Sequence, residues 1–357
     1  IISLPRFLTN AAHFGHCLHA MADITNKTDI ELGVVATHSG WVGGIVPDDE
    51  GNAPRTSAGE LVVLAEMEKL QELSRVQING VQLPVIPGTK SEDFDEICNG
   101  IKDLDLNLYF VLMVGGADPM NPEDESAVTD QLLPGLEAAK NHGVTIVSST
   151  SIEEWMSGSP RKDGADFEAA VEQNAKLHHR CYTEAALADS CVDSWHVEFL
   201  RPGEFATFTD IGRLWKFLQV ANSLVGGESK FFKSLTDAAH CGDSALTIPE
   251  NEDLIAQMGE TGELGCFHAS AMTTRGCLST DDGWIGSLLT AVAKTGTLSQ
   301  VFVELFRHDD AALQALRDLD PGHGIDTTDG RDYNQCTADG LADIAHRLNN
   351  LKARGIL

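Results

Sequence analysis

Four side chains that could bind a cation come at matching places in four successive segments of the chain. Glu198, Asp237, His268 and Glu304 each end a short, mostly apolar run. Any one of them alone would more often be a capped or salt-bridged residue, but their repetition at the same point favours a shared site. Oxygen ligands with one imidazole nitrogen suit a hard or borderline cation. We therefore expect one divalent metal ion, Mn²⁺ ahead of Mg²⁺, Co²⁺ or Zn²⁺.

The segments that carry these residues belong to a longer alternation of strand-like and helical stretches. Strands are predicted near 32–36, 76–85, 108–113, 144–147, 195–199, 230–236, 264–268 and 301–305. Amphipathic helical patterns lie between them. Eight such units in sequence predict a parallel sheet closed into a (β/α)₈ TIM barrel, an α/β fold. The strand ends would then meet at one mouth of the barrel.

The alternation also predicts how the chain is divided. Residues 1–30 lie outside the repeat and are interpreted as an N-terminal extension, while 31–357 form a single barrel domain. Turns rich in Gly, Pro, Asp and Ser follow three strands, and in a barrel they lie on the active-site face. His38 and Trp41 follow the first strand there and are candidates for contact with a substrate, as is Trp155 after the fourth.

Four short motifs connect the second half of the chain to a known family. They are Glu198-Phe-Leu-Arg-Pro-Gly-Glu204, Asp237-Ala-Ala-His240, Phe267-His268-Ala-Ser and Val303-Glu304. With these motifs the chain resembles the xylose isomerase-like TIM-barrel superfamily. Within it, the chain resembles the sugar phosphate isomerase/epimerase family, with members such as the D-tagatose 3-epimerases.

The resemblance implies roles for particular residues. Glu198, Asp237, His268 and Glu304 would bind one divalent metal, and the two glutamates would also transfer protons as catalytic acid and base. His240 and Glu204 would contact the substrate. Arg275 is the candidate for an arginine that follows the metal-binding histidine in this family.

The chemistry of such a site permits more than one reaction. Removing a proton beside a carbonyl gives an enediolate, which a metal stabilises as a Lewis acid. Two carboxylates on opposite sides of a sugar would epimerise it, whereas one carboxylate moving the proton between neighbouring carbons would interconvert aldose and ketose. The same machinery could act as a lyase or dehydratase on a keto-sugar, keto-inositol or keto-glycoside. A DNA-repair endonuclease and a non-catalytic sugar-binding barrel are the remaining alternatives.

Charge and composition restrict the partners. The 357 residues carry 54 Asp and Glu against 25 Lys and Arg, a net charge of −29. This charge disfavours nucleic acids and anionic membranes, and its direct consequence is solubility. A small carbohydrate as the substrate is what the family resemblance implies. Eight cysteines without a C-x-x-C pair are typical of reduced thiols, so a cytoplasmic location is predicted, with a signal removed before residue 1 left open. A homo-oligomer also stays open.

Overall fold

The computed structural model describes residues 23–226, 230–271 and 283–357 and shows a closed barrel of parallel strands in the order β1 to β8. The strands are β1 (Glu31–Val35), β2 (Gly80–Val85), β3 (Asn107–Leu112), β4 (Ile146–Ser149), β5 (Ser194–Val197), β6 (Phe232–Asp237), β7 (Leu264–Ala269) and β8 (Gln300–Val303). The predicted (β/α)₈ barrel is confirmed.

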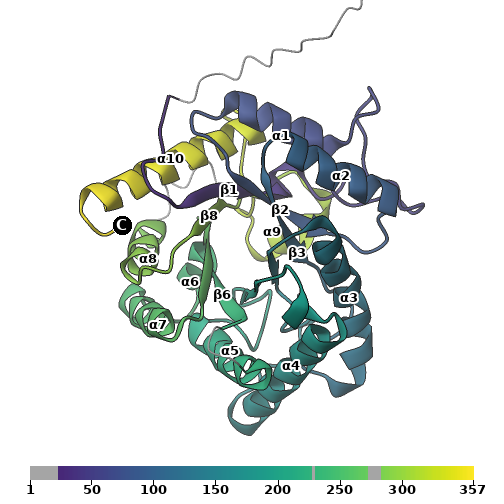
Figure 1. Ribbon diagram of the computed structural model, residues 1–357, viewed down its shortest axis with the longest axis vertical. Helices are drawn as coiled ribbons and strands as arrows, with labels where there is room; N and C mark the ends of the chain where they lie inside the picture. The colour runs from purple at the N-terminus through teal and green to yellow at the C-terminus, as the bar shows by residue number, and fades with distance from the viewer. Residues whose placement is uncertain (1–22, 227–229, 272–282) are drawn as a thin grey trace, which may run out of the picture.

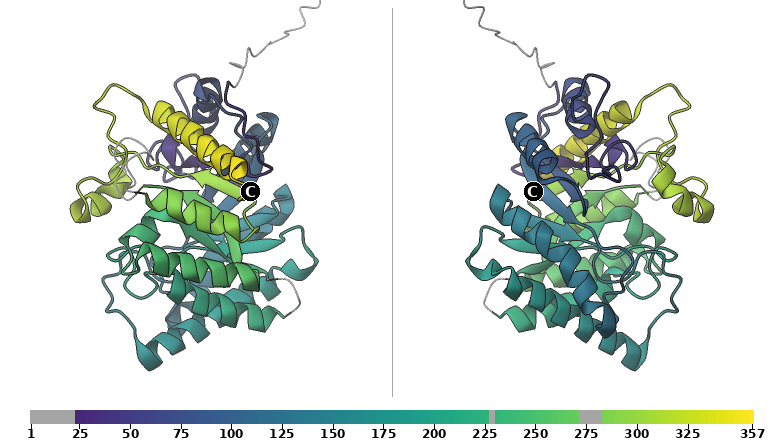
Figure 2. Two further views of the ribbon diagram at one scale, coloured as in Figure 1. Left: turned by 90° about the vertical axis from the view of Figure 1, so that its left-hand side faces the viewer. Right: turned by 90° about the vertical axis from the view of Figure 1, so that its right-hand side faces the viewer.

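A ring of helices surrounds the barrel (Figure 1). The helices are α1 (Val62–Leu73), α2 (Ser91–Asp103), α3 (Glu125–His142), α4 (Gly164–Glu184), α5 (Ile211–Val225), α6 (Ala238–Asp243), α7 (Ile248–Thr261), α8 (Trp284–Lys294), α9 (Gln314–Leu319) and α10 (Tyr333–Ala353). The last helix lies beside α1, so the two ends of the barrel domain meet (Figures 1 and 2). Among the described residues, no helix combines the length and the apolar composition needed to cross a membrane.

Two apolar regions stabilise the barrel. The larger lies between the sheet and the surrounding helices and contains residues from almost every element. A small separate cluster fills the inside of the barrel, with Tyr109, Leu235, Cys266 and Phe302 among its members. Because strands covered on both faces must bury both sets of side chains, the predicted runs are nearly continuous in apolar residues.

Element boundaries differ from the prediction in a few places. The second strand begins at Gly80 rather than near 76, since Val76 forms an isolated bridge with Ile24 and the Asn79 side chain accepts a hydrogen bond from the Leu32 backbone N–H. The short helix α6 directly after Asp237 was not predicted. Residues 1–22 of the proposed extension lie outside the described residues, so its boundary at residue 30 stays a prediction.

Candidate metal centre

The four predicted ligand residues lie together at the carboxyl ends of β5 to β8. Glu198 follows β5, Asp237 ends β6, His268 is the penultimate residue of β7 and Glu304 follows β8. One potential ligand atom from each lies within 4.8 Å of the others. Parallel strands in a closed barrel bring equivalent ends to one mouth, which is why residues more than 100 positions apart in the chain meet here.

The histidine ring lies between the two glutamates. His268 Nδ1 is 3.3 Å from Glu304 Oε2 and 3.8 Å from Glu198 Oε1. The other ring nitrogen, Nε2, lies 2.6 Å from Oε1 of Gln82, inside the barrel. His240 Nε2 approaches Glu198 Oε1 from another side at 3.7 Å. The ring of His268 therefore presents Nδ1 to the carboxylate cluster and Nε2 to the barrel interior.

Both oxygens of Asp237 accept hydrogen bonds from neighbouring groups. Oδ1 accepts the backbone N–H of His240 at 2.7 Å, as the N-cap of α6, and Oδ2 accepts the hydroxyl of Ser270. An N-cap aspartate is held in a defined orientation by the helix it begins. The helix α6 thus orients Asp237 and brings His240 to the same mouth, whereas the contact of Ser270 was not predicted from the sequence.

The cluster has strongly perturbed electrostatics. Burial and the nearby carboxylates of Glu304 and Asp237 raise the pKa of Glu198 well above its ordinary value. Burial also raises the pKa of Asp237. Burial opposes ionisation of Glu304 as well, but His268, with smaller contributions from His240 and His323, holds the pKa of Glu304 below its ordinary value. Close carboxylates in a buried site repel one another unless a positive charge compensates them.

A divalent cation fits these residues. Glu198 Oε1 is buried and has no hydrogen-bond partner among the described residues, which is costly for a carboxylate oxygen unless a cation contacts it. Three carboxylates and one imidazole nitrogen form a donor set suited to Mn²⁺ or a similar ion. The group is therefore a candidate metal-binding centre.

Glu204 lies in a second polar network beside this centre. Its Oε1 accepts the indole N–H of Trp155 at 3.1 Å and its Oε2 accepts Nε–H of Arg201 at 3.0 Å. Arg201 also reaches Asp243 and Asp320, both at 3.4 Å. One guanidinium thus joins the loop after β5 to the last residue of α6 and to the residue that follows α9, a contact that no pattern in the sequence indicates. Glu204 also lines a cavity of about 370 Å³ between residues 157–161 and 202–209.

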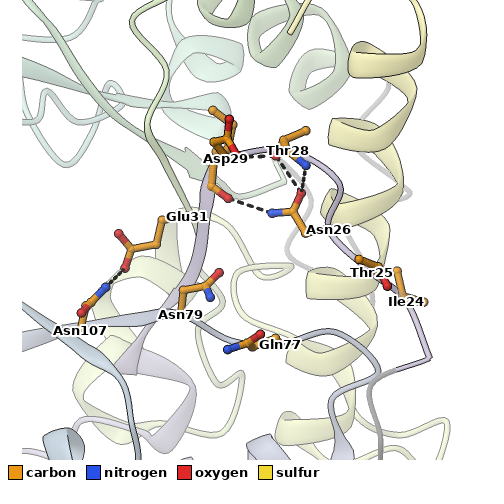
Figure 3. Close-up of a pocket in the computed structure, with 10 residues that line it drawn as sticks. Ile24, Thr25, Asn26, Thr28, Asp29, Glu31, Gln77, Asn79 and Asn107 are labelled. Carbon is orange, nitrogen blue, oxygen red and sulfur yellow. Dashed lines mark hydrogen bonds between the residues drawn. The ribbon is translucent and has the colours of Figure 1, made fainter.

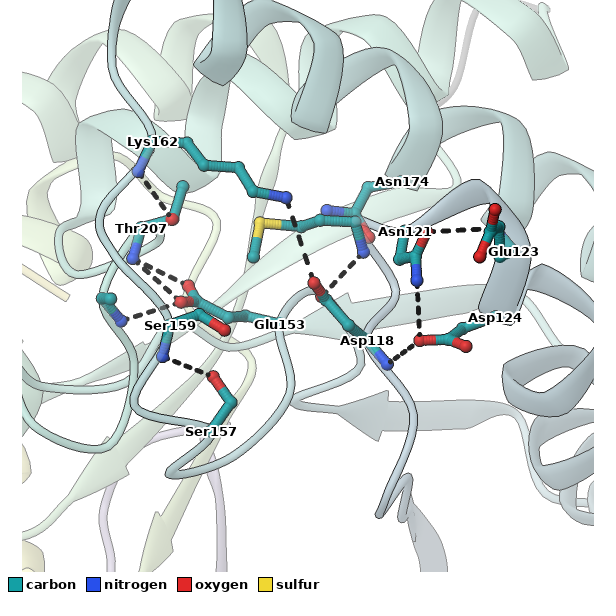
Figure 4. Close-up of polar contacts among 12 residues, drawn as sticks. Asp118, Asn121, Glu123, Asp124, Glu153, Ser157, Ser159, Lys162, Asn174 and Thr207 are labelled. Atoms are coloured by element: carbon teal, nitrogen blue, oxygen red, sulfur yellow. Dashed lines mark hydrogen bonds and ion pairs between the residues drawn. The ribbon is translucent and has the colours of Figure 1, made fainter.

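The loop that carries Glu204 is fixed by a buried carboxylate. Glu153 lies in the loop after β4, and its carboxylate accepts the backbone N–H groups of Ala206, Thr207 and Phe208 at 2.8–3.0 Å (Figure 4). Burial of a carboxylate is costly unless several donors satisfy it. Glu153 therefore holds the loops after β4 and β5 together at the mouth of the barrel.

The remaining predicted site residues make no contact with the cluster among the described residues, or lie outside those residues. His38 is buried, and its Nδ1 lies 3.1 Å from the Val35 carbonyl oxygen. The backbone N–H of Trp41 donates to the carboxylate of Asp310. Within the described residues, no hydrogen bond or ion pair joins either side chain to the four-residue cluster. Arg275 lies outside the described residues.

His323 is a further residue at this mouth that the sequence did not indicate. Burial lowers its pKa to about 4, and it is close enough to Arg201 and Glu204 for their charges to act on it. Its Nε2 is buried without a hydrogen-bond partner among the described residues. No motif surrounds His323 in the loop after β8, so only the folded chain places it near the candidate site.

A larger cavity lies at the opposite end of the barrel. It has a volume of about 550 Å³ and is lined by residues near the amino ends of β1 to β3, including Asn79 (Figure 3). Glu31 on its wall already accepts hydrogen bonds from Asn107, Tyr109 and Gln300. In TIM-barrel enzymes the chemistry takes place at the carboxyl face, so the cluster is the candidate site in preference to this cavity.

The fold and the cluster define a (β/α)₈ barrel with a candidate divalent-cation centre at its carboxyl mouth. Comparison of the sequence with family models and with curated proteins finds no match. Solved structures do match in fold, and they include several sugar 3-epimerases. An L-ribulose 3-epimerase has a TM-score of 0.69 at 13% identity, over 91% of this chain and 97% of that one.

Two other solved structures show the breadth of this fold. A D-allulose 3-epimerase from Methylomonas sp. in complex with D-allulose has a TM-score of 0.67 at 14% identity, over 89% of this chain and 97% of that one. A family 2 AP endonuclease from Brucella melitensis has a TM-score of 0.54 at 13% identity, over 77% of this chain and 92% of that one. At these identities the likeness establishes the fold, and the activity has to be argued from the site.

Proposed function

We propose that this protein is a divalent-metal-dependent sugar isomerase or epimerase. The observation that carries the proposal is the convergence of Glu198, Asp237, His268 and Glu304 at the carboxyl mouth. The sugar 3-epimerases among the similar structures support a carbohydrate substrate. These four residues would hold the ion, with Mn²⁺ as the best match to the donor set. When bound, the ion supplies Lewis-acid polarisation of oxygens beside the reacting carbon.

Glu198 and Glu304 are the proposed proton-transfer pair. They come from β5 and β8, which are separated by two strands, so they approach the mouth from different directions. One carboxylate would remove the proton beside the carbonyl and the other would return a proton to the opposite face, which inverts the carbon. Asp237 and His268 would act as ligands without transferring a proton.

Substrate hydroxyls would be held by groups around the cluster. His240 faces Glu198 and has a buried Nδ1 with no hydrogen-bond partner among the described residues. Glu204 is held in place by Trp155 and Arg201. Trp155 is 40% exposed at the rim, where its indole face could stack on a sugar ring. Arg275, His38 and Trp41 remain proposed substrate contacts of lower rank.

The endonuclease alternative is not supported by the electrostatics. A net charge of −29 repels a DNA backbone, whose binding depends on neutralising phosphates with Lys and Arg. A neutral sugar has no such conflict with the carboxylate-rich mouth. The fold shared with an AP endonuclease therefore does not extend to a proposal of activity on DNA.

A screen of keto-sugars in deuterated water with added Mn²⁺ tests the proposed function. Solvent deuterium should enter the substrate at the carbon that epimerises or isomerises, and a metal-stripped sample should show no exchange. Recording exchange, epimerisation and elimination in one spectrum separates an isomerase from a lyase or dehydratase. A protein that binds Mn²⁺ but exchanges no proton on any keto-sugar would contradict the proposal.

A further inference from the structure

We propose that Gln82 is a positioning residue that keeps a proton on Nε2 of His268, so that Nδ1 is the ring nitrogen offered to the carboxylate cluster and to a cation bound there. The inference rests on the proposed metal-dependent function. It assigns a role to a directional chain of hydrogen bonds that crosses the barrel interior from β3 to β7.

The chain of hydrogen bonds joins four strands. The Ser148 hydroxyl on β4 lies 3.2 Å from the Phe110 carbonyl oxygen on β3. Gln82 on β2 places its Nε2 at 3.4 Å from Ser148 Oγ and its Oε1 at 2.6 Å from His268 Nε2 on β7. Gln82 and Ser148 are each only 1% exposed, so water does not compete for these contacts.

The direction of each hydrogen bond follows from the first. A backbone carbonyl can only accept, so the single hydroxyl hydrogen of Ser148 is used on Phe110. Ser148 Oγ then has only lone pairs to offer, and the Gln82 amide must turn its N–H toward it. The Gln82 carbonyl oxygen is left facing His268, and it can only accept a proton from Nε2–H.

A proton held on Nε2 makes Nδ1 the nitrogen that a cation would bind, in place of the proton that Nδ1 donates to the Glu304 carboxylate in the metal-free site. Nδ1 is the nitrogen that lies 3.3 Å from Glu304 Oε2 and 3.8 Å from Glu198 Oε1. The reversed amide would donate to Nε2 and move the proton to Nδ1, where a cation could not bind. Histidine ligands are commonly oriented by such an acceptor on the far nitrogen, and its removal costs about 10–100-fold in metal affinity or activity.

A neighbouring histidine shows the contrasting arrangement. His196 on β5 also points into the barrel, but its Nδ1 accepts the backbone N–H of Cys266 at 3.1 Å and its Nε2 lies 3.0 Å from Ser194 Oγ. Both nitrogens are thus used within the protein. The two histidines inside the barrel therefore differ in their hydrogen bonds. Both nitrogens of His196 contact groups outside the cluster, whereas Nδ1 of His268 faces the cluster.

The test compares three variants in metal binding to the metal-stripped protein. Gln82→Leu removes the acceptor and should weaken Mn²⁺ binding by about 10–100-fold in isothermal titration calorimetry. Gln82→Glu keeps an acceptor oxygen and should stay within a few-fold of wild type. Gln173→Leu is the matched control, since this glutamine is also largely buried but contacts Glu125 on the outer helices.

Nitrogen chemical shifts of His268 provide a readout that needs neither metal nor substrate. With ¹⁵N-labelled histidine, His268 of the wild type should show a protonated Nε2, and Gln82→Leu should shift the ring toward Nδ1–H. A wild-type spectrum with a neutral ring protonated at Nδ1, or wild-type metal affinity in a folded Gln82→Leu variant, would overturn the proposal. A wild type that binds Mn²⁺ without acting on any sugar would instead overturn the proposed function alone. If Gln82→Leu fails to fold, the wild-type spectrum and Gln82→Glu still decide the matter.

Discussion

Glu198 and Glu304 are chemically identical side chains whose surroundings differ. Glu304 lies 3.3 Å from the imidazole of His268, whereas Glu198 Oε1 has no hydrogen-bond partner among the described residues. The pKa of Glu198 is accordingly raised by burial and by neighbouring carboxylates, and that of Glu304 is held low by His268 despite its burial. Groups with opposed shifts in one mouth are typical of acid and base partners.

Replacing either glutamate with glutamine should separate catalysis from folding. Glu304→Gln and Glu198→Gln keep the size of the side chain and one ligand oxygen but remove the basic oxygen. Turnover in the deuterium-exchange assay should fall about 10²–10⁴-fold, the usual loss when a general base is removed. Asp237→Asn is the comparison, because it should weaken metal binding and recover activity with excess metal. Exchange at the wild-type rate in a metal-loaded glutamine variant would show that this glutamate is not a base.

At the scale of elements, buried polar side chains join strands to a helix below the mouth of the barrel. The indole N–H of Trp195 on β5 donates to Ser149 on β4, and the Ser149 hydroxyl lies 2.7 Å from that of Ser151. Ser151 in turn contacts His178 of α4 at 2.9 Å. This buried chain joins β4, β5 and α4 directly below the loops that carry Glu153 and Glu204.

His178 should make stability depend on pH in a defined window. Burial lowers its pKa from 6.5 to about 4, so the unfolded chain binds a proton more readily than the folded one between these values. The free energy of unfolding should therefore fall as pH falls through this window, by about 3 kcal/mol in total from this residue. Urea denaturation of the wild type and of His178→Gln at pH 7 and pH 5 measures the change in the free energy of unfolding between these pH values. The variant should be less stable at pH 7, but between pH 7 and pH 5 its free energy of unfolding should fall by about 2 kcal/mol less than that of the wild type. Equal falls in the two proteins would refute a role of His178 in this pH dependence.

A glycine in β7 should be needed for the barrel to close around His196. A Cβ at Gly265 would lie 2.6 Å from the Ser234 carbonyl oxygen and 2.7 Å from His196 Nδ1. Gly265→Ala should therefore destabilise the protein by about 1–3 kcal/mol, as overpacking in a core typically does. Gly115→Ala is the control, because a Cβ there would meet no atom within 4 Å, and it should change stability by less than about 0.5 kcal/mol. Equal midpoints of urea denaturation for the two variants would argue against this packing constraint.

The whole molecule carries an unusually large negative charge for its size. A net charge of −29 over 357 residues creates self-repulsion in the folded state. The same charge would repel anionic ligands from the carboxylate-rich mouth and agrees with a neutral sugar as substrate. The charge thus acts on partner choice and stability, not on the fold itself.

Salt should stabilise the protein by screening this repulsion. Raising NaCl from about 0.01 to 0.1 M shortens the Debye length from about 30 to 10 Å. The melting temperature in the presence of EDTA should rise, by about 1–2 °C for each kcal/mol of repulsion that is screened in a chain of 357 residues. KCl at the same ionic strength should have the same effect, which separates screening from ion-specific binding. An unchanged or lower melting temperature in both salts would show that the charges are already compensated locally.

The sequence by itself determined the barrel and its mouth. Eight alternating units predict a closed parallel sheet because each buried strand needs a helix on its outer face, and each ligand candidate ends such a strand. The sequence indicates the four residues of the cluster because each ends one of four successive strands. In a closed barrel the equivalent ends of parallel strands meet at one mouth. The proximity of these four residues follows from the geometry of the barrel and requires no knowledge of side-chain contacts.

Only the tertiary structure decided which other residues surround the cluster. Gln82 looks like one more strand residue in the sequence, and His323 lies in no motif. Arg201 and Ser270 lie inside two of the motifs, but the motifs do not indicate what their side chains contact. Their contacts depend on side-chain directions across strands and loops that are distant in the chain, and local periodicity contains no information about these. The orientation of the His268 ring is decided in the same way, since the hydrogen bonds that set it begin four strands away at the Phe110 carbonyl.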